Sequence, residues 1–311
     1  MRGNTVRHCG ECPAHGGGPA EAAWHLREAT RQERAYLGAV SRNLSAIDKL
    51  TDRQIRDTVS LLRAAKLRIN AAINEIPAGS FQAFYLPELK AEVARIFEEF
   101  QTQYKAEFQR LQIDIQDLGT KLVQEPLAKL GFNMTFPSLP SNITQALATF
   151  HADQIVAISN EAIAKISTQL SLGLLSPDPK PGALVKAIAK LLPSPASSGT
   201  IAGRAKTIIR TEVGRIHAYS TQARMEQAVE VAPGLRKYWL PAYRNTRPSH
   251  LAAGRDYDEA NAIPVNEPFY IGGFPAMYPR DPALPAEEVV NCSCASVPTV
   301  LDVEPPGGYV A

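Results

Sequence analysis

Residues 88–123 read ELKAEVARIFEEFQTQYKAEFQRLQIDIQDLGTKLV, and this stretch has the strongest helical periodicity in the chain. Ten of its large apolar side chains are separated only by three or four residues, which is the spacing of one face of an α-helix. They are Leu89, Val93, Ile96, Phe100, Tyr104, Phe108, Leu111, Ile115, Leu118 and Leu122. A helix over this stretch would be about 50 Å long at about 1.5 Å per residue. Because that exceeds the width of a small domain, the pattern predicts long helices that pack side by side.

Residues 21–76, on the N-terminal side, also have a helical pattern. Thr51 and Gln54 have the spacing of a capping box, in which two side chains satisfy free backbone N–H groups at a helix start. We therefore expect a second helix to begin near Asp52.

On the C-terminal side, we expect Pro126 to end the long helix, because proline lacks the N–H group that continues it. Further helices are predicted from Asn142 to about Leu172 and from Ala183 to Leu192. Two Pro- and Ser-rich breaks follow within a short distance, at 176–182 and 193–199. Such a composition is typical of a linker between domains.

The character of the sequence changes after Gly199. A polar helix is predicted from Thr200 to Val229 and a strand from Lys237 to Tyr243, interrupted by Pro241. A final strand is expected around Cys292 to Val300. The fold class is therefore mainly α, with a long-helix N-terminal region followed by a small α+β C-terminal module. The expected parts are a flexible arm (1–20), a helical region (21–192), a linker (193–199), the α+β module (200–300) and a tail (301–311).

Composition restricts the function. The chain has 33 Lys and Arg residues and 31 Asp and Glu residues, a net charge of +2. This balance argues against a general nucleic-acid-binding protein, because affinity for phosphates needs a clustered excess of basic residues. A local basic face on the helix after Thr200 could still meet DNA phosphates, although glutamates dilute it. No apolar run reaches the ~18 residues of a membrane span, and we expect no secretory signal, because no apolar segment follows Arg2 and Arg7. We expect a soluble protein, made in a cytoplasm, with no membrane partner.

The four cysteines form two close pairs. Cys9 and Cys12, with His8 and His15 nearby, resemble half of a zinc site, or else belong to an arm that binds nothing. A second pair, Cys292 and Cys294, lies on the predicted final strand, where residues two apart face the same side.

The second pair has two interpretations. With His250 brought close, Cys292 and Cys294 could bind zinc; otherwise they pack as small apolar side chains, and we expect packing. No bound cofactor is therefore predicted, with zinc as the alternative.

Arg210, Glu212 and His250 could be interpreted as a catalytic set. The sequence has no nucleophile elbow and no Gly-rich phosphate loop to position them. We expect Arg210 and Glu212 to form a buried ion pair instead, and Asn291 to be a turn or cap residue. No catalytic residue is predicted.

One set of residues resembles a known family: Arg210-Thr211-Glu212, Trp239, Thr246-Arg247 with His250, a Pro-rich loop, and Asn291-Cys292-Ser293-Cys294. In this order they resemble the phage Mu F-like head-morphogenesis family, the minor head proteins of tailed phages. The resemblance covers about residues 200–300. Ser293 departs from it, since the family has Arg at that place.

The resemblance implies a minor structural protein of the phage head, without enzymatic activity, found in the virion and, during assembly, in the host cytoplasm. The implied partners are the portal protein, the major capsid protein and packaged double-stranded DNA, with roles in assembly and in genome packaging or ejection. The alternative is an enzyme, a hydrolase or a toxin-type activity, carried on such a scaffold. We expect Arg210, Glu212, His250, Asn291 and Cys294 to meet in one place and hold the module together.

Overall fold

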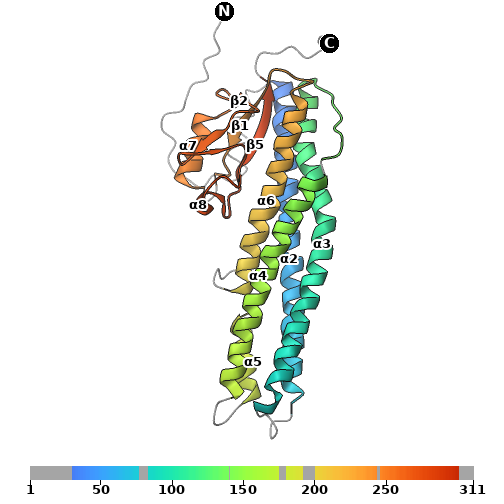
Figure 1. The fold of residues 1–311 in the computed structure, drawn as a ribbon. Coiled ribbons are helices and arrows are strands. Elements are labelled where there is room, and N and C mark those ends of the chain that lie inside the picture. The colour runs from blue at the N-terminus through green and yellow to red at the C-terminus, as the bar shows by residue number, and fades with distance from the viewer. Residues whose placement is uncertain are drawn as a thin grey trace, which may run out of the picture.

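The computed structural model describes residues 30–76, 83–139, 141–174, 180–191, 200–243 and 246–300. Four long helices run side by side, with a small module of strands and short helices against one end (Figure 1). The helices are α2 (Arg31–Asn74), α3 (Leu86–Lys129), α4 (Ser141–Leu174) and α6 (Ile201–Ala228). A short helix, α5 (Pro181–Leu191), packs against α4, and a 3-10 turn, η2 (Ala83–Tyr85), precedes α3. The predicted fold class is confirmed.

The apolar face predicted over residues 88–123 forms the centre of the bundle. Nine of its ten side chains are buried and Leu118 is partly buried. Facing them are α2, α4 and α6, through residues such as Ile69, Ile166 and Ile209. The aromatic side chains of α3 contact one another along this seam, edge-on between Phe97 and Phe100 and stacked from Phe100 through Tyr104 to Phe108. Burial of this face, worth about 25 cal/mol per Å² of apolar surface, stabilises the bundle.

Helix α2 is continuous, so the predicted helix start near Asp52 is wrong. Thr51 donates its hydroxyl hydrogen to the carbonyl of Ile47 one turn earlier, which is a helix-interior contact. The capping box lies instead at the true start, where Thr30 and Glu33 exchange hydrogen bonds. The helix therefore continues through the capping pattern at Thr51, because the turns before and after it bury apolar residues such as Ile47 and Ile55.

Helix α3 also continues through Pro126, which we expected to end it, and stops at Lys129. Proline removes one hydrogen bond to the preceding turn, but Pro126 and Leu127 are buried, and their packing offsets that loss. The chain turns at Gly131, whose φ of 93° favours glycine.

Helix α6 is the fourth helix of the bundle, and this changes the expected boundary at residue 200. Its apolar residues share one core with α2, α3 and α4. Gly119 of α3 allows a close approach, because a Cβ atom there would lie 2.7 Å from the Cβ of Ser220 and 3.0 Å from the carbonyl oxygen of His217. Residues 200–228 therefore belong to the bundle, and the module packed on it comprises residues 229–300. The expected arm, linker and tail (1–20, 193–199 and 301–311) lie outside the described residues.

The module contains two small antiparallel sheets. One has the order β2-β1-β5, in which β1 is Leu235–Leu240, β2 is Ile263–Pro264 and β5 is Ala295–Val300. The other pairs β3 (Phe269–Ile271) with β4 (Phe274–Ala276). Two short helices, α7 (Pro248–Asp256) and α8 (Ala286–Val289), complete it. Strand β1 ends before Pro241, and β5 begins three residues later than expected, so both cysteines precede it.

The module is joined to the bundle by buried contacts. Tyr36 of α2 donates a hydrogen bond of 2.6 Å to the carbonyl of Pro298 in β5. Tyr36 also packs with Tyr238 and Val297 of the sheet and with Leu122 of α3. These contacts between the first and last parts of the fold determine where the module lies.

Among the described residues, no helix is both long enough and apolar enough to cross a membrane.

Candidate functional site

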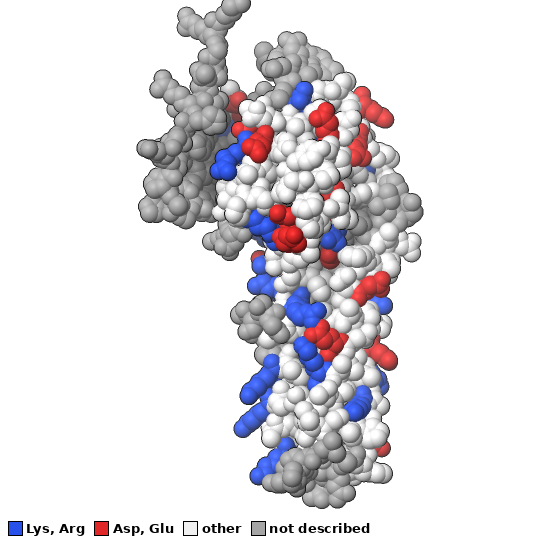
Figure 2. Space-filling model, turned by 60° about the vertical axis from the view of Figure 1, so that its left-hand side comes forward, with Lys and Arg blue, Asp and Glu red and all other residues white. Residues whose placement is uncertain are grey.

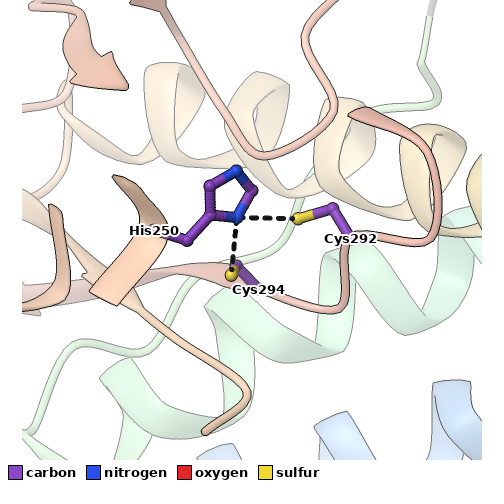
Figure 3. Close-up of side chains that lie close together, drawn as sticks. All are labelled: His250, Cys292 and Cys294. Carbon is purple, nitrogen blue, oxygen red and sulfur yellow. Dashed lines mark hydrogen bonds between the residues drawn. The ribbon is translucent and has the colours of Figure 1, made fainter. Parts of the chain in front are cut away.

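His250, Cys292 and Cys294 meet in the interior of the module (Figure 3). The Nδ1 atom of His250 lies 3.3 Å from the Sγ atom of Cys294 and 3.5 Å from that of Cys292. All three residues are buried, with at most 3% of their surface exposed. The three polar atoms therefore face one another out of contact with solvent.

Local structure explains why these side chains converge. His250 lies in the first turn of α7, which Pro248 begins. The two cysteines belong to a tight turn after α8, where Asn291 adopts a φ of 56°. Asparagine tolerates this left-handed conformation better than most residues, which confirms the turn expected at Asn291. The turn reverses the chain so that both sulfur atoms point toward α7.

Arg280 fixes the backbone of the cysteine turn. Its Nε atom donates to the carbonyl of Cys292 at 2.7 Å, and Nη1 donates to the carbonyls of Gly214 in α6 and Cys294. A Cβ atom at residue 214 would collide with the guanidinium group and displace it from this position. In addition, the backbone N–H of Asn291 donates to the hydroxyl of Thr211. The turn is thereby held against α6.

The other side of the imidazole ring faces a carboxylate. The Nε2 atom of His250 lies 3.0 Å from an oxygen of Glu288, although not aligned as a full hydrogen bond. Ser249 donates a hydrogen bond of 2.9 Å to the same carboxylate. Trp239 packs edge-on against the imidazole ring, 5.5 Å between centroids. The ring of His250 is therefore confined from three directions.

The pKa values of the two thiols are shifted in opposite directions. A hydrogen bond from Cys294 lowers the pKa of Cys292, and Arg280 and His250 lower it further, against the effect of burial. The same hydrogen bond and burial raise the pKa of Cys294. One proton shared between the two sulfur atoms accounts for both directions.

Glu212 and Arg210 do not form the buried pair that we expected. Glu212 is buried and pairs with Arg215 at 2.8 Å. Burial is the largest influence on its pKa and raises it, while Arg215 lowers it. Arg210 points out of the bundle toward Asp52, at 3.4 Å, with both side chains about half exposed. The reason is helical geometry: residues 210 and 212 lie about 200° apart around the helix axis, so they cannot face the same way.

The expected meeting of five residues is therefore partly correct. His250 and Cys294 are in contact, and Asn291 reaches α6 through Thr211. Glu212 joins the same region through Arg215, which donates to the carbonyl of Arg280. Arg210 does not take part.

Other predicted residues are near the site without entering it. Arg247 donates from the surface to the carbonyl of Val290, next to the cysteine turn. The candidate ligands Cys9, Cys12 and His15 lie outside the described residues.

Sequence reasoning did not identify Glu288, Arg280 or Arg215 as part of the site. Arg280 lies in the loop-rich stretch before the final strand and Glu288 lies in the short helix α8, and nothing in the spacing marks either residue. Arg215 lies three residues after Glu212, so the helical i,i+3 spacing was the one available signal.

A shallow hollow of about 290 Å³ lies over the outer side of this region, where α6 meets the module. Its lining includes Thr211, Glu212 and Arg215 and the apolar side chains Phe150 and Leu284. The guanidinium of Arg215 lies 5.3 Å from the ring centroid of Phe150. The acidic and basic groups of the hollow are thus already paired with each other.

Comparison with known proteins finds a partial similarity. No protein-family model matches the chain, and no solved structure matches it. Over 103 residues it is 32% identical to the NAD(+)–arginine ADP-ribosyltransferase EFV of Enterococcus faecalis strain ATCC 700802 / V583. The similarity takes in 33% of this chain and 20% of that protein. The chain therefore spans about one fifth of the length of this relative.

Proposed function

We propose that the chain is a minor structural protein of a tailed-phage or prophage head, which binds the portal and the inner capsid surface. The proposal rests on the structural role of the residues that resemble the phage family. Thr211, Asn291 and Cys294 hold one turn against α6 and α7, and Thr211 and Cys294 are buried. Residues that resemble the phage family therefore maintain a shape, and the work of the protein is binding.

The long bundle supplies a surface for such binding. A 44-residue helix such as α2 or α3 is about 66 Å long at about 1.5 Å per residue. One flank of a rod of that length is sufficient for the ~1,200–2,000 Å² that a stable protein interface buries.

Charge on the surface favours protein partners over a continuous DNA-binding groove. Figure 2 shows Lys and Arg along the bundle with acidic side chains between them. Ion pairs such as Arg95 with Glu92 and Lys121 with Asp117 neutralise part of this charge. Contact with packaged DNA is therefore a secondary role, at scattered phosphates.

Copurification with particles tests the proposal. Heads produced by induction of the source phage or prophage are separated on a density gradient and their proteins identified by mass spectrometry. We expect this chain in the head fraction, and we expect it to be captured by immobilised portal rings. If neither the particles nor the portal rings contain it, the proposal is wrong.

A second candidate is arginine ADP-ribosyl transfer, which the partial similarity to the E. faecalis protein favours. The buried carboxyl of Glu212, beside the hollow, is the group to test for this activity. Incubation of the full chain with labelled NAD and an arginine-rich acceptor, with Glu212→Gln as the matched variant, decides between the two. Transfer that depends on Glu212 would establish the enzyme; no transfer by either form favours the structural protein.

A further inference from the structure

We propose that His250, Cys292 and Cys294 bind one zinc ion, which fastens the turn at residues 290–294 to helix α7. This site is independent of the proposed head function. It changes our sequence-based expectation that the two cysteines only pack.

The distances fit the ion. Zinc lies about 2.3 Å from a cysteine sulfur and about 2.0–2.1 Å from a histidine nitrogen, and a tetrahedral arrangement then separates nitrogen from sulfur by about 3.5–3.6 Å. The observed separations from Nδ1 of His250 are 3.3 Å and 3.5 Å, and all three ligand atoms lie within 4.8 Å of one another. For the two nitrogen–sulfur separations, coordination therefore needs changes of only a few tenths of an ångström.

Hydrogen bonds satisfy all three atoms only as a chain, in which one thiol donates to Nδ1 and the other donates to the neighbouring sulfur. A neutral imidazole has one acceptor nitrogen with a single lone pair, so only one thiol can donate to it. Figure 3 shows both sulfur atoms directed at the same Nδ1 atom. A metal ion between the three atoms would use a lone pair of each, whereas the chain of hydrogen bonds leaves one sulfur as a donor only.

The surroundings have the features of a metal site. Histidine ligands commonly turn their second nitrogen toward a carboxylate, which fixes the ring and increases its basicity. Glu288 lies in that place, and Ser249 holds it. Arg280 fixes the carbonyls of both cysteines, so the ligands are positioned before an ion arrives.

The ligand set selects zinc. Two thiolates and an imidazole are poor ligands for magnesium or calcium, which prefer oxygen, and are a common set for zinc. Three protein ligands leave the fourth tetrahedral position for a water molecule.

Metal analysis of the full chain is the first experiment. The protein is purified without a polyhistidine tag or chelator, and its metals are measured by mass spectrometry. We expect about one zinc per chain, as a site with this ligand set binds a single ion. The variant Cys292→Ser with Cys294→Ser should lose it, and the matched control Cys9→Ser with Cys12→Ser should keep it. Loss in the control with retention in the first variant would overturn the proposal.

Two further measurements test the zinc site without the cysteine variant, in case that variant does not fold. Cobalt substituted into the unchanged protein should give the intense absorption of a tetrahedral site together with thiolate charge transfer. In addition, Glu288→Gln retains all three ligands and should weaken zinc affinity by about 10–100-fold, measured by competition with a chromophoric chelator.

Three results would overturn the inference: folded protein with no bound zinc and both thiols free to titrate, a disulfide between Cys292 and Cys294, or cobalt spectra without thiolate bands. Unchanged zinc affinity in Glu288→Gln would also contradict it, because the geometry assigns that carboxylate to the ligand ring.

Discussion

Neighbouring residues of the Arg-Thr-Glu element should differ sharply in their contribution to stability. Glu212 is buried, and its pair with Arg215 has side chains only 9% and 12% exposed. Arg210, two residues away, is 44% exposed, and its partner Asp52 is 56% exposed. We predict that Glu212→Ala is strongly destabilising and that Arg210→Ala is nearly neutral.

The magnitudes follow from what each change leaves behind. Removing one partner of a buried ion pair costs about 3–5 kcal/mol, because the other charge remains buried. Arg215 keeps its bond to the Arg280 carbonyl and its contact with Phe150, so we expect about 3 kcal/mol for Glu212→Ala, the lower end. An exposed pair contributes about 0.2–1 kcal/mol, which is the limit for Arg210→Ala.

Urea unfolding measures both variants. A Trp24→Phe background leaves Trp239, which is buried in the module, as the fluorescent reporter, and far-ultraviolet circular dichroism follows the bundle. With a slope of about 1–3 kcal/mol per molar urea, a 3 kcal/mol loss moves the midpoint by at least about 1 M. Equal midpoints for the two variants, or a larger shift for Arg210→Ala, would refute the assignment of Glu212 to the interior.

Two other predictions concern the bundle. Gly119→Ala should be less stable than Gly38→Ala by about 1–3 kcal/mol, because both gain helix propensity but only the first forces α3 away from α6. Equal stability of the two variants in thermal unfolding would contradict the close packing of α6. Burial lowers the pKa of His151 and of His217 from 6.5 to about 3, so between these values the unfolded chain binds more protons than the folded one. Stability should therefore fall on acidification from pH 6.5 toward 3, by up to about 1.4 kcal/mol per pH unit for each histidine. His151→Phe should reduce that slope, as measured by urea midpoints against pH, and parallel profiles would contradict this account.

Long-range periodicity was the reliable part of the sequence. Apolar residues spaced by three and four over residues 88–123 must lie on one helix face, whatever that face contacts, and nearly all of them are buried. Local signals for the start or end of a helix were less reliable. The capping pattern at Thr51 and the proline at residue 126 both lie inside helices, because burial of neighbouring residues outweighed a preference of about one hydrogen bond.

The site could be predicted in part. Its cysteine pair and His250 were identified by residue type and by the family resemblance, and zinc stood as the alternative to packing. The structure adds Glu288 and Arg280, which no motif marked, and it removes Arg210, whose direction depends on the rotation of α6 in the bundle.

Periodicity and side-chain chemistry are properties of local residues, so the helical class and the candidate ligands could be predicted without a structure. The place of α6 as the fourth helix of the bundle could not, and neither could the distances of 3.3 Å and 3.5 Å between His250 and sulfur atoms more than 40 residues away. Such contacts depend on how separate elements pack. Packing is set by the shapes of all the buried faces together, and no single stretch of sequence contains that information.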